Sequence, residues 1–361
     1  MRHMFAGAMG PKGFVDYFDN IMPLEKAKRR YYLKGPSGSG KSTFLKKIVA
    51  SLEAEGFYTE QFHCSNDAES LDAIAVPGKG LCFMDATLPH MRDPQIPVAI
   101  DRIIDFSVFA DEKKASGRET EIKQILKIKE LILRKAAGYF NTLGALYCAD
   151  VSAAGAALSA SSSENLLGKL TAVLDECKIE KNTNLGTDRK LFLCAVTPEG
   201  PVSFAHDFFE GCTVYGLSSE NNIGVDIALK RLQNEALSRG IDTESFYDPL
   251  APDKLLQLYL PATNTAFAAA AGLFGCKTGL SETIDFGQYI DPRMLDAVKC
   301  NMECDNELFG VLLAETIDIM KESKKMHGKI EDIYADTIDF RHVNEMTEEI
   351  ICDVLNWLKS Q

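Results

Sequence analysis

The sequence predicts an α/β protein made of two tandem copies of one domain, at residues 1–187 and 188–361. Three observations carry this prediction: an internal repeat, short strands that alternate with helices, and a glycine-rich loop between a strand and a helix. Strands that alternate with helices are typical of a mostly parallel sheet with helices on both faces. Each copy is expected to end in a helical section, because apolar residues recur at helical spacing in 119–147, 305–326 and 345–359.

The repeat appears when the chain is compared with itself. Residues 2–15 match residues 189–202 at an offset of 187, with Arg, Phe, Ala, Pro, Gly and Val in register. Further matches follow at an offset of 184 between residues 44 and 83, and at an offset of 180 at residues 104–106. Small offset changes in one direction predict a duplicated domain with short deletions. The boundary is expected in the polar, turn-forming stretch 181–188.

Short apolar or aromatic runs mark the expected strands. In the first half they lie near 4–9, 30–34, 57–64 and 81–85, and in the second half near 191–196, 213–217, 244–248 and 265–271. The runs come in the same order in both halves, which is what a duplicated sheet requires.

The stretch Gly-Pro-Ser-Gly-Ser-Gly-Lys-Ser at residues 35–42 fits the phosphate-binding pattern G-x-x-x-x-G-K-[ST] without a mismatch. Its glycines allow the backbone to curl so that N–H groups point at a β-phosphate, and the following helix adds its positive N-terminus. Lys41 is expected to reach the β- and γ-phosphates, and the Ser42 hydroxyl to bind Mg²⁺. The predicted ATP-binding residues are Gly35, Pro36, Ser37, Gly38, Ser39, Gly40, Lys41, Ser42 and Thr43.

Asp85 ends the apolar run Leu81–Met84, a pattern that delivers a carboxylate beside Mg²⁺ at the edge of a sheet. Alternatively, Asp85 caps the next turn and binds no metal. Many phosphate-loop ATPases carry a Glu directly after this Asp, but Ala86 follows here, so the sequence predicts slow hydrolysis or a base from elsewhere. His90 lies on the same loop and is a candidate catalytic residue, or an ordinary surface histidine.

Other candidates in the first half leave two readings open. Ser65 and Asp67 follow a strand, where a kinase would receive its acceptor substrate, although Asp67 also suits the N-cap of a helix near Ala68. Arg92, Arg102 and Arg118 are candidates for neutralising a transferred phosphoryl group, and the sequence does not choose among them. In the second half, His327, Glu331 and Tyr334 share a helix face, either as a polar cluster or as a zinc site.

The second copy has lost the residues that a nucleotide needs. At an offset of 184, residues 219–226 replace the glycine-rich loop, and only Gly224 is retained. Val225 stands in place of Lys41, Asp226 in place of Ser42, and Ala269 in place of Asp85. With Glu220 adding negative charge, this half is expected to be a degenerate nucleotide site kept for packing, for an interface or for another ligand.

These motifs identify the chain as similar to the P-loop nucleoside triphosphatases. Residues 5–13, 35–42 and 83–90 further resemble a bacterial family of tandem-duplicated P-loop ATPases, described as ATP-binding proteins of unknown role. The resemblance covers nearly the whole chain. It implies two P-loop NTPase-like domains and bound ATP, but it names no substrate.

Composition sets the outer limits. The first half carries 24 Lys and Arg against 23 Asp and Glu, whereas the second half carries 15 against 29, a net charge of −14 that argues against extended nucleic-acid binding. The absence of an 18-residue apolar run and of a signal-peptide core, together with ten scattered cysteines, predicts a cytoplasmic protein without a membrane span. The second domain is expected to pack on the first or on another chain.

The function predicted from these features is Mg²⁺-dependent ATP binding with slow hydrolysis to ADP and phosphate in the first domain. One alternative is a small-molecule or nucleotide kinase that uses the same loop, although the chain shows no Arg-rich lid. Another is an ATP-gated scaffold or binding protein, in which the nucleotide fixes how the two halves dock.

Overall fold

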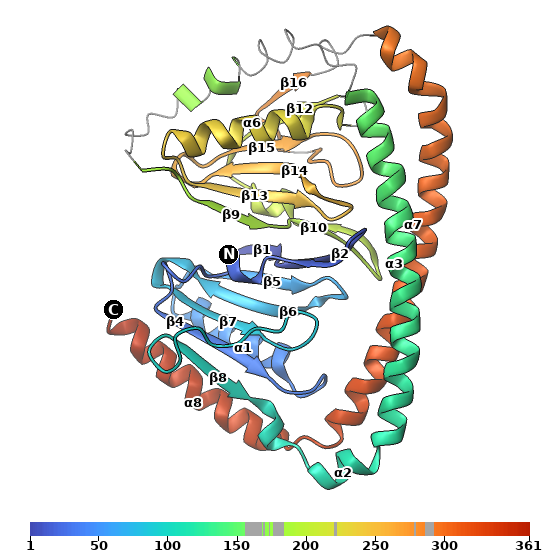
Figure 1. The fold of residues 1–361 in the computed structure, drawn as a ribbon. Helices are drawn as coiled ribbons and strands as arrows, with labels where there is room; N and C mark the ends of the chain where they lie inside the picture. Colours follow the sequence, from blue (N-terminus) through green and yellow to red (C-terminus); the bar gives the residue numbers. More distant parts are fainter. Residues whose placement is uncertain are drawn as a thin grey trace.

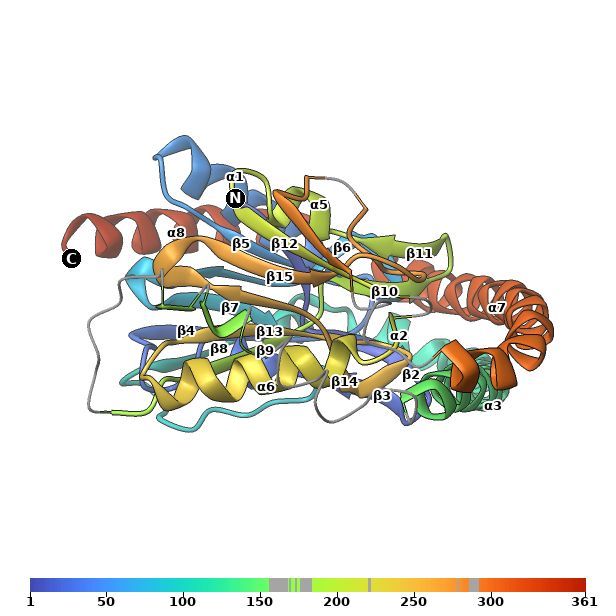
Figure 2. The ribbon, with the colours of Figure 1, turned by 90° about the horizontal axis from the view of Figure 1, so that it is seen from above.

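The computed structural model describes residues 1–155, 168, 170–172, 174–175, 184–219, 222–277, 279–285 and 292–361. The chain forms two six-stranded sheets, one above the other, with a pair of long helices along one side of both (Figure 1). Seen from above, this helical pair lies at one end of the sheets (Figure 2). Within the described residues, no helix is both long and apolar enough to cross a bilayer.

The first half contains one mixed sheet in the order β1-β5-β6-β7-β4-β8 and a separate β2-β3 hairpin. β6 is antiparallel to both of its neighbours, and the other pairs are parallel. Its elements are β1 (Arg2–Phe5), β2 (Gly7–Gly10), β3 (Gly13–Asp16), η1 (Phe18–Asn20), β4 (Arg29–Lys34), α1 (Lys41–Ala54), β5 (Glu60–Cys64), β6 (Asp67–Val76), η2 (Pro77–Lys79), β7 (Leu81–Asp85), β8 (Asp101–Asp105), η3 (Phe106–Phe109), α2 (Glu112–Gly117) and α3 (Glu119–Gly155).

The second half repeats this topology. Its sheet has the order β9-β13-β14-β15-β12-β16, with β14 antiparallel to both neighbours, and β10-β11 is the second hairpin. Its elements are β9 (Asp188–Leu191), β10 (Cys194–Thr197), β11 (Gly200–Ser203), α5 (Ala205–Phe208), β12 (Thr213–Ser218), α6 (Val225–Ser238), β13 (Thr243–Asp248), β14 (Ala251–Leu260), η5 (Pro261–Thr263), β15 (Thr265–Ala269), β16 (Glu282–Asp285), α7 (Pro292–Ala335) and α8 (Phe340–Lys359). The predicted duplicated α/β fold is therefore confirmed.

The sheets contain strands that the sequence analysis did not predict: β6 and β8 in the first half, β14 and β16 in the second. The helix considered near Ala68 is wrong, because Asp67 begins β6. β6 folds back on β5 as a hairpin, and its Leu71, Ile74 and Val76 are buried in the core under α1. Each sheet is consequently mixed at its centre.

The helical section that follows each sheet packs on the other half. α8 follows the second sheet, yet Val354 and Leu358 are buried in the core of the first half. Leu170 and Leu174, which follow the first sheet and lie 184 residues earlier, are buried in the core of the second half. An ion pair closes each contact, between Lys359 and Glu55 at 2.9 Å and between Arg239 and Asp175 at 2.6 Å.

These two ion pairs occupy equivalent positions at an offset of 184, with the charges exchanged. The helical tail of each half thus covers the other half. The predicted boundary at 181–188 lies partly outside the described residues and stays a prediction.

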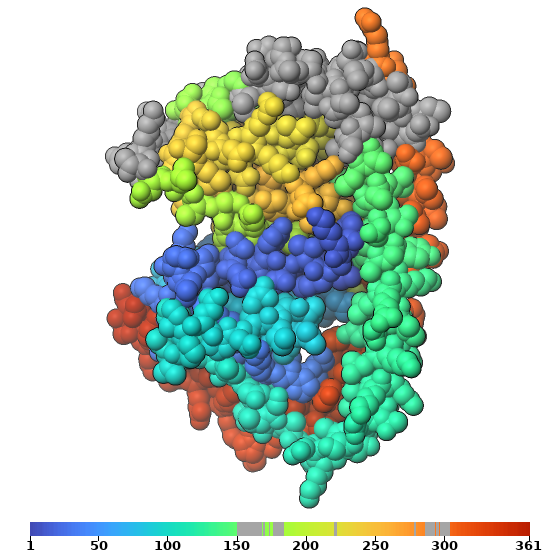
Figure 3. Space-filling model, in the orientation of Figure 1, coloured from blue at the N-terminus to red at the C-terminus, as the bar shows by residue number. Residues whose placement is uncertain are grey.

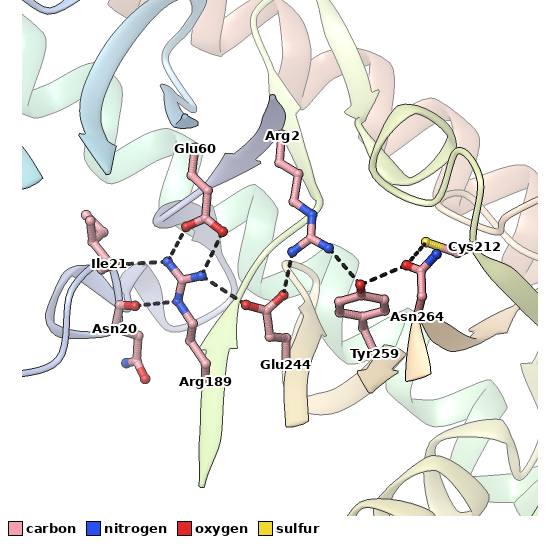
Figure 4. Close-up of polar contacts among 9 residues, drawn as sticks. All are labelled: Arg2, Asn20, Ile21, Glu60, Arg189, Cys212, Glu244, Tyr259 and Asn264. Atoms are coloured by element: carbon pink, nitrogen blue, oxygen red, sulfur yellow. Dashed lines mark hydrogen bonds and ion pairs between the residues drawn. The ribbon is translucent and has the colours of Figure 1, made fainter. Parts of the chain in front are cut away.

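The two sheets meet at their β1 and β9 edges. Phe5 and Phe192, equivalent residues of the repeat, exchange two backbone hydrogen bonds of 2.9 and 3.1 Å, as expected on an approximate two-fold axis. Beside them lies an ion cluster (Figure 4), in which Arg189 binds Glu60 at 2.7 Å and Glu244 at 3.0 Å. Its equivalent Arg2 binds Glu244 at 3.3 Å. Burial raises the pKa of Glu244, and the two arginines act against this shift.

Candidate functional site

The glycine-rich loop lies where β4 ends and α1 begins, in the order that the sequence predicts. Gly38 and Gly40 have φ of +77° and +94°, a left-handed conformation that favours glycine. A side chain at Gly38 is excluded for a second reason, since its Cβ would lie 2.3 Å from the carbonyl oxygen of Glu331 on α7. The loop therefore needs glycine both to turn and to accept the helix that lies against it.

Lys41 lies inside this loop. Its Nζ donates hydrogen bonds to the carbonyl oxygens of Gly35 at 2.8 Å and Pro36 at 2.9 Å, and it lies 3.7 Å from Oδ2 of Asp85. Ser39 is fully buried, and its hydroxyl has no hydrogen-bond partner among the described residues. The loop thus holds a buried cation and one unused polar group.

Ser42 and Asp85, the predicted metal ligands, both have partners within the protein. The Ser42 hydroxyl oxygen accepts a 3.0 Å hydrogen bond from the backbone N–H of Leu71 in β6. Asp85 uses Oδ1 to accept from the backbone N–H and hydroxyl of Thr87, while Oδ2 faces Lys41. Asp85 therefore caps the following turn and also lies beside the loop, and its role as a metal ligand stays a prediction.

His90 is not the surface histidine that the sequence allowed, because its side chain is 7% exposed. Its ring stacks on Phe18 with centroids 4.3 Å apart, and Nδ1 lies 3.0 Å from the carbonyl oxygen of Asp85. Nε2 then faces Asp72 of β6, with Oδ2 at 3.8 Å. Burial raises the pKa of Asp72 to about 6, and His90 opposes this shift.

Sequence reasoning named Asp72 only as a carboxylate that, like Asp67, could hold the metal in place of Asp85, and gave it no catalytic role. The available signal was its place as a lone carboxylate in the otherwise apolar run Leu71–Val76. β6 was not predicted, so nothing indicated that this acid faces the loop.

Ser65 and Asp67 lie at the same edge of the sheet, but both are engaged. Ser65 is buried, and Asp67 accepts a 2.6 Å hydrogen bond from Ser70 and pairs with Lys324 of α7 at 2.9 Å. Burial acts to raise the pKa of Asp67, and the hydrogen bonds from Ser70 and Lys324 outweigh it and lower the pKa.

The three candidate arginines are used in other contacts. Arg92 pairs with Asp16 and Asp19, Arg118 pairs with Glu121, and Arg102 lies over the ring of Tyr31. The cations that the structure places near the loop are lysines of the helical pair instead.

Helix α7 contributes His327 and Glu331 to the neighbourhood of the loop. Nε2 of His327 lies 3.5 Å from Glu331, and Nδ1 lies 2.8 Å from Nζ of Lys129 on α3. Burial, followed by the charges of Lys129 and Lys41, lowers the pKa of His327 to about 4. The zinc alternative gains no support: within the described residues, no group of three or more His, Cys, Asp or Glu is arranged to hold a metal. Tyr334 packs in the apolar contact between α3 and α7.

The second copy keeps the shape of the loop without its chemistry. Asn222 and Gly224 have φ of +56° and +78°, matching Gly38 and Gly40, and α6 begins at Val225 as α1 begins at Lys41. Asn tolerates the left-handed conformation better than most side chains. Glu220 lies outside the described residues.

A cavity of about 10 Å³ at this position has space for about one water molecule. Its lining comprises Tyr147, Asn222, Val225, Asp226, Asp248, Lys254, Leu255, Leu256 and Ala269.

Comparisons of the chain with protein-family models, with curated proteins and with solved structures give no match. The resemblance to bacterial tandem P-loop ATPases therefore stays a prediction.

Proposed function

We propose that the first half binds ATP with Mg²⁺ at residues 35–43 and hydrolyses it slowly. The observation that carries this proposal is the conformation of the loop, where left-handed glycines lead into α1 and the Lys41 ammonium lies within the turn beside Asp85. Backbone N–H groups at a helix N-terminus, next to a buried cation, favour a polyanion. The unused hydroxyl of Ser39 adds a polar group inside the loop.

The residues present fit a Mg²⁺–nucleotide. Lys41 would neutralise the β- and γ-phosphates, and Ser42 and Asp85 would hold the ion, which supplies further charge neutralisation across the same two phosphates. The hydrogen bond from Leu71 to the Ser42 oxygen fixes the hydroxyl at the start of α1. Thr43 is exposed beside the loop, where the sequence predicts contact with the α-phosphate.

Hydrolysis also needs a group that accepts the proton of the attacking water, and Ala86 has none to offer. We assign this role to Asp72, because its carboxylate is 15% exposed, lies 3.8 Å from His90 and has a pKa raised to about 6. His90 is held by the ring of Phe18 and the carbonyl of Asp85, so it positions the carboxylate. Hydrolysis is expected to be slow, because the proton acceptor Asp72 lies on β6 and does not directly follow Asp85.

A second candidate is the ATP-gated scaffold, and one observation favours it. The loop of the first half lies against α7, which follows the second sheet, with Gly38 and the backbone of Glu331 in close contact. Nucleotide bound here would lie next to the helices that connect the halves. The kinase alternative receives less support, since Asp67 is occupied by Ser70 and Lys324.

Lys41→Ala tests the proposal. The variant is expected to lose ATP binding by calorimetry, at least about 100-fold, because contacts from one charged group to two phosphates are removed. Its circular dichroism and melting temperature should stay close to those of the parent, since Lys41 bonds only to its own loop and Asp85.

Lys46→Ala, an exposed lysine on the same helix, is the matched control and should bind ATP like the parent. Equal ATP affinity and turnover in Lys41→Ala and Lys46→Ala would defeat the assignment of the site.

A further inference from the structure

The helices α3 and α7 are equivalent elements of the repeat, and their contacts fix the alignment between them. The tails that follow them align at an offset of 184, because Leu170 and Leu174 correspond to Val354 and Leu358 in burial and in the half that they cover. The same offset makes Glu331 equivalent to Tyr147. Each residue lies at the loop of one half. Glu331 lies against Gly38 in the first half, and Tyr147 lines the cavity beside Asn222 in the second.

This alignment corrects the offset of 187 that the start of the repeat suggests for the helices. With 184, the polar pair Lys129 and His327 corresponds to Leu313, which packs against the apolar core of the second half, and to Leu143, which is fully buried. The hydrogen-bonded residues Lys129 and His327 of the first site thus correspond to two apolar residues at the second.

The helix face that lies over each loop shows the same contrast between polar residues at the first loop and apolar residues at the second. Over the first loop α7 presents Lys324, His327 and Glu331, with side chains 37%, 30% and 47% exposed. The equivalent residues of α3 over the second loop are Phe140, Leu143 and Tyr147, of which the first two are fully buried. Figure 3 shows an opening between the first half, coloured blue to cyan, and α3, coloured green. The polar helix face therefore occurs only where the loop has kept its Lys, Ser and Asp partners.

The charges on this polar face are suited to an anion. Nζ of Lys129 has the neutral ring of His327 as its hydrogen-bond partner, and among the described residues no carboxylate lies within ion-pair distance of it. Burial, and after it the positive charges of Lys129 and Lys41, lower the pKa of His327, so both lysines lie near this ring, together with Asp67 and Asp85, whose charges act in the opposite direction. Lys324 is the second cation here, held by Asp67 and by Glu199 in the turn between β10 and β11.

We propose that Lys129 of α3 and Lys324 of α7 form the far wall of the nucleotide site and bind the phosphates of ATP held by residues 35–43. This inference rests on the proposed function and extends it, because it places two phosphate ligands on the helices that connect the halves. His327 positions Lys129 through its hydrogen bond, and Lys324 exchanges an acidic partner for a phosphate oxygen.

The test compares the affinities of Lys129→Ala and Lys324→Ala for ATP, ADP and AMP by calorimetry. Each variant is expected to lose about 10-fold or more in affinity for ATP and less for AMP, which lacks the β- and γ-phosphates. Lys129→Arg and Lys324→Arg should retain most of the affinity, because they keep the positive charge.

Lys321→Ala and Lys325→Ala are the matched controls on α7. Both lysines are exposed and pair only with the acid three residues earlier, Asp318 and Glu322. These variants should bind all three nucleotides like the parent. Thermal melting establishes that each variant is folded, and Lys129→Gln and Lys324→Gln replace any alanine variant that is not.

The outcomes separate the inference from the function on which it rests. If Lys41→Ala abolishes ATP binding while the Lys129 and Lys324 variants bind ATP like the controls, the far wall is wrong and the loop assignment stands. If losses at Lys129 and Lys324 are equal for ATP and AMP, the lysines do not bind the β- or γ-phosphates and the inference is again overturned. A parent protein that binds no ATP overturns both.

Discussion

The two halves of this chain have the same sheet topology and differ in chemistry at the edge of the sheet where β4 or β12 ends. Two left-handed positions of the loop occur in both halves, at Gly38 and Gly40 in the first and at Asn222 and Gly224 in the second. What differs is the chemistry at the loop and on the helix that lies against it. The comparison teaches that fold and site chemistry are separable, because α6 of the second half begins with Val225 and Asp226 where α1 of the first half begins with Lys41 and Ser42.

The substitutions at the second site are also mutually consistent. Val225 removes the cation and Ala269 removes the acid, and the helix above them is apolar at Phe140 and Leu143. The small cavity beside Asn222 is lined by apolar residues and also by Asp226, Asp248 and Lys254. In the first half, α7 presents the polar side chains Lys324, His327 and Glu331 beside the loop, and Figure 3 shows an opening between this half and α3.

The largest expected effect is in nucleotide stoichiometry. Losing one charge-assisted phosphate contact costs about 1.5–3 kcal/mol, and the second loop lacks several of them, so its affinity should be lower by several powers of ten. We expect calorimetry to give one tightly bound ATP per chain, at residues 35–43, and none at 219–226. Two comparable sites per chain would break the comparison between the halves.

The ion cluster between the sheets gives the next largest effect, on stability. Arg189 binds two buried acids and also donates to the carbonyl oxygens of Asn20 at 2.8 Å and Ile21 at 2.9 Å (Figure 4). Its equivalent Arg2 binds Glu244 and the hydroxyl of Tyr259. Arg189→Ala should lower the free energy of unfolding by about 3–5 kcal/mol, because it leaves the buried Glu60 without its cation and Glu244 with Arg2 alone.

Arg2→Ala is the matched variant and should cost less, about 1–2 kcal/mol, because Arg189 still neutralises Glu244. Urea unfolding of both variants measures the difference. Equal losses would mean that the cluster is as symmetric as the fold, in contradiction to the contacts that distinguish the two arginines.

The sequence predicted those parts of the molecule whose signals are local. Residues 35–42 are contiguous, so one stretch of sequence contains the turn, the cation and the hydroxyl. The sequence analysis missed β6 because three of its first four residues, Asp67–Ser70, are polar. Only the second part of the strand is largely apolar. The stripe on α8 indicated a buried face, but a stripe does not indicate which half covers it, so the exchange of helices was not predicted.

The remainder of the site comes from distant parts of the chain. Asp72, Lys129 and Lys324 approach the loop through β6, α3 and α7, and no spacing in the sequence relates them to Lys41. The equivalence of α3 and α7 could be read from the sequence only at the correct offset, and the matches near Arg2 and Arg189 suggested a different one. Structure was needed because packing, and not local sequence, brings these residues together.

A further expected effect, confined to a narrow pH range, concerns Asp72, whose equivalent at an offset of 184 is the buried Leu256. The pKa of Asp72 is raised from 3.8 to about 6 by burial, so between these pH values the folded state binds a proton that the unfolded state has released. The free energy of unfolding should therefore fall as the pH rises through about 4 to 6, by about 1–3 kcal/mol from this group. Asp72→Asn keeps the shape of the protonated form and should remove this part of the decrease. Urea unfolding of parent and variant at pH 4.5, 6 and 7.5 measures this difference, since other carboxyl groups with a raised pKa, such as Glu244 and Asp248, titrate equally in both proteins.

If Asp72 also accepts the proton in hydrolysis, the turnover of the parent rises as the pH rises through about 6. The variant then binds ATP but shows neither this turnover nor its pH dependence. Parallel stability curves together with unchanged turnover in Asp72→Asn would show that the first half does not use this carboxylate, and that it differs from Leu256 in polarity alone.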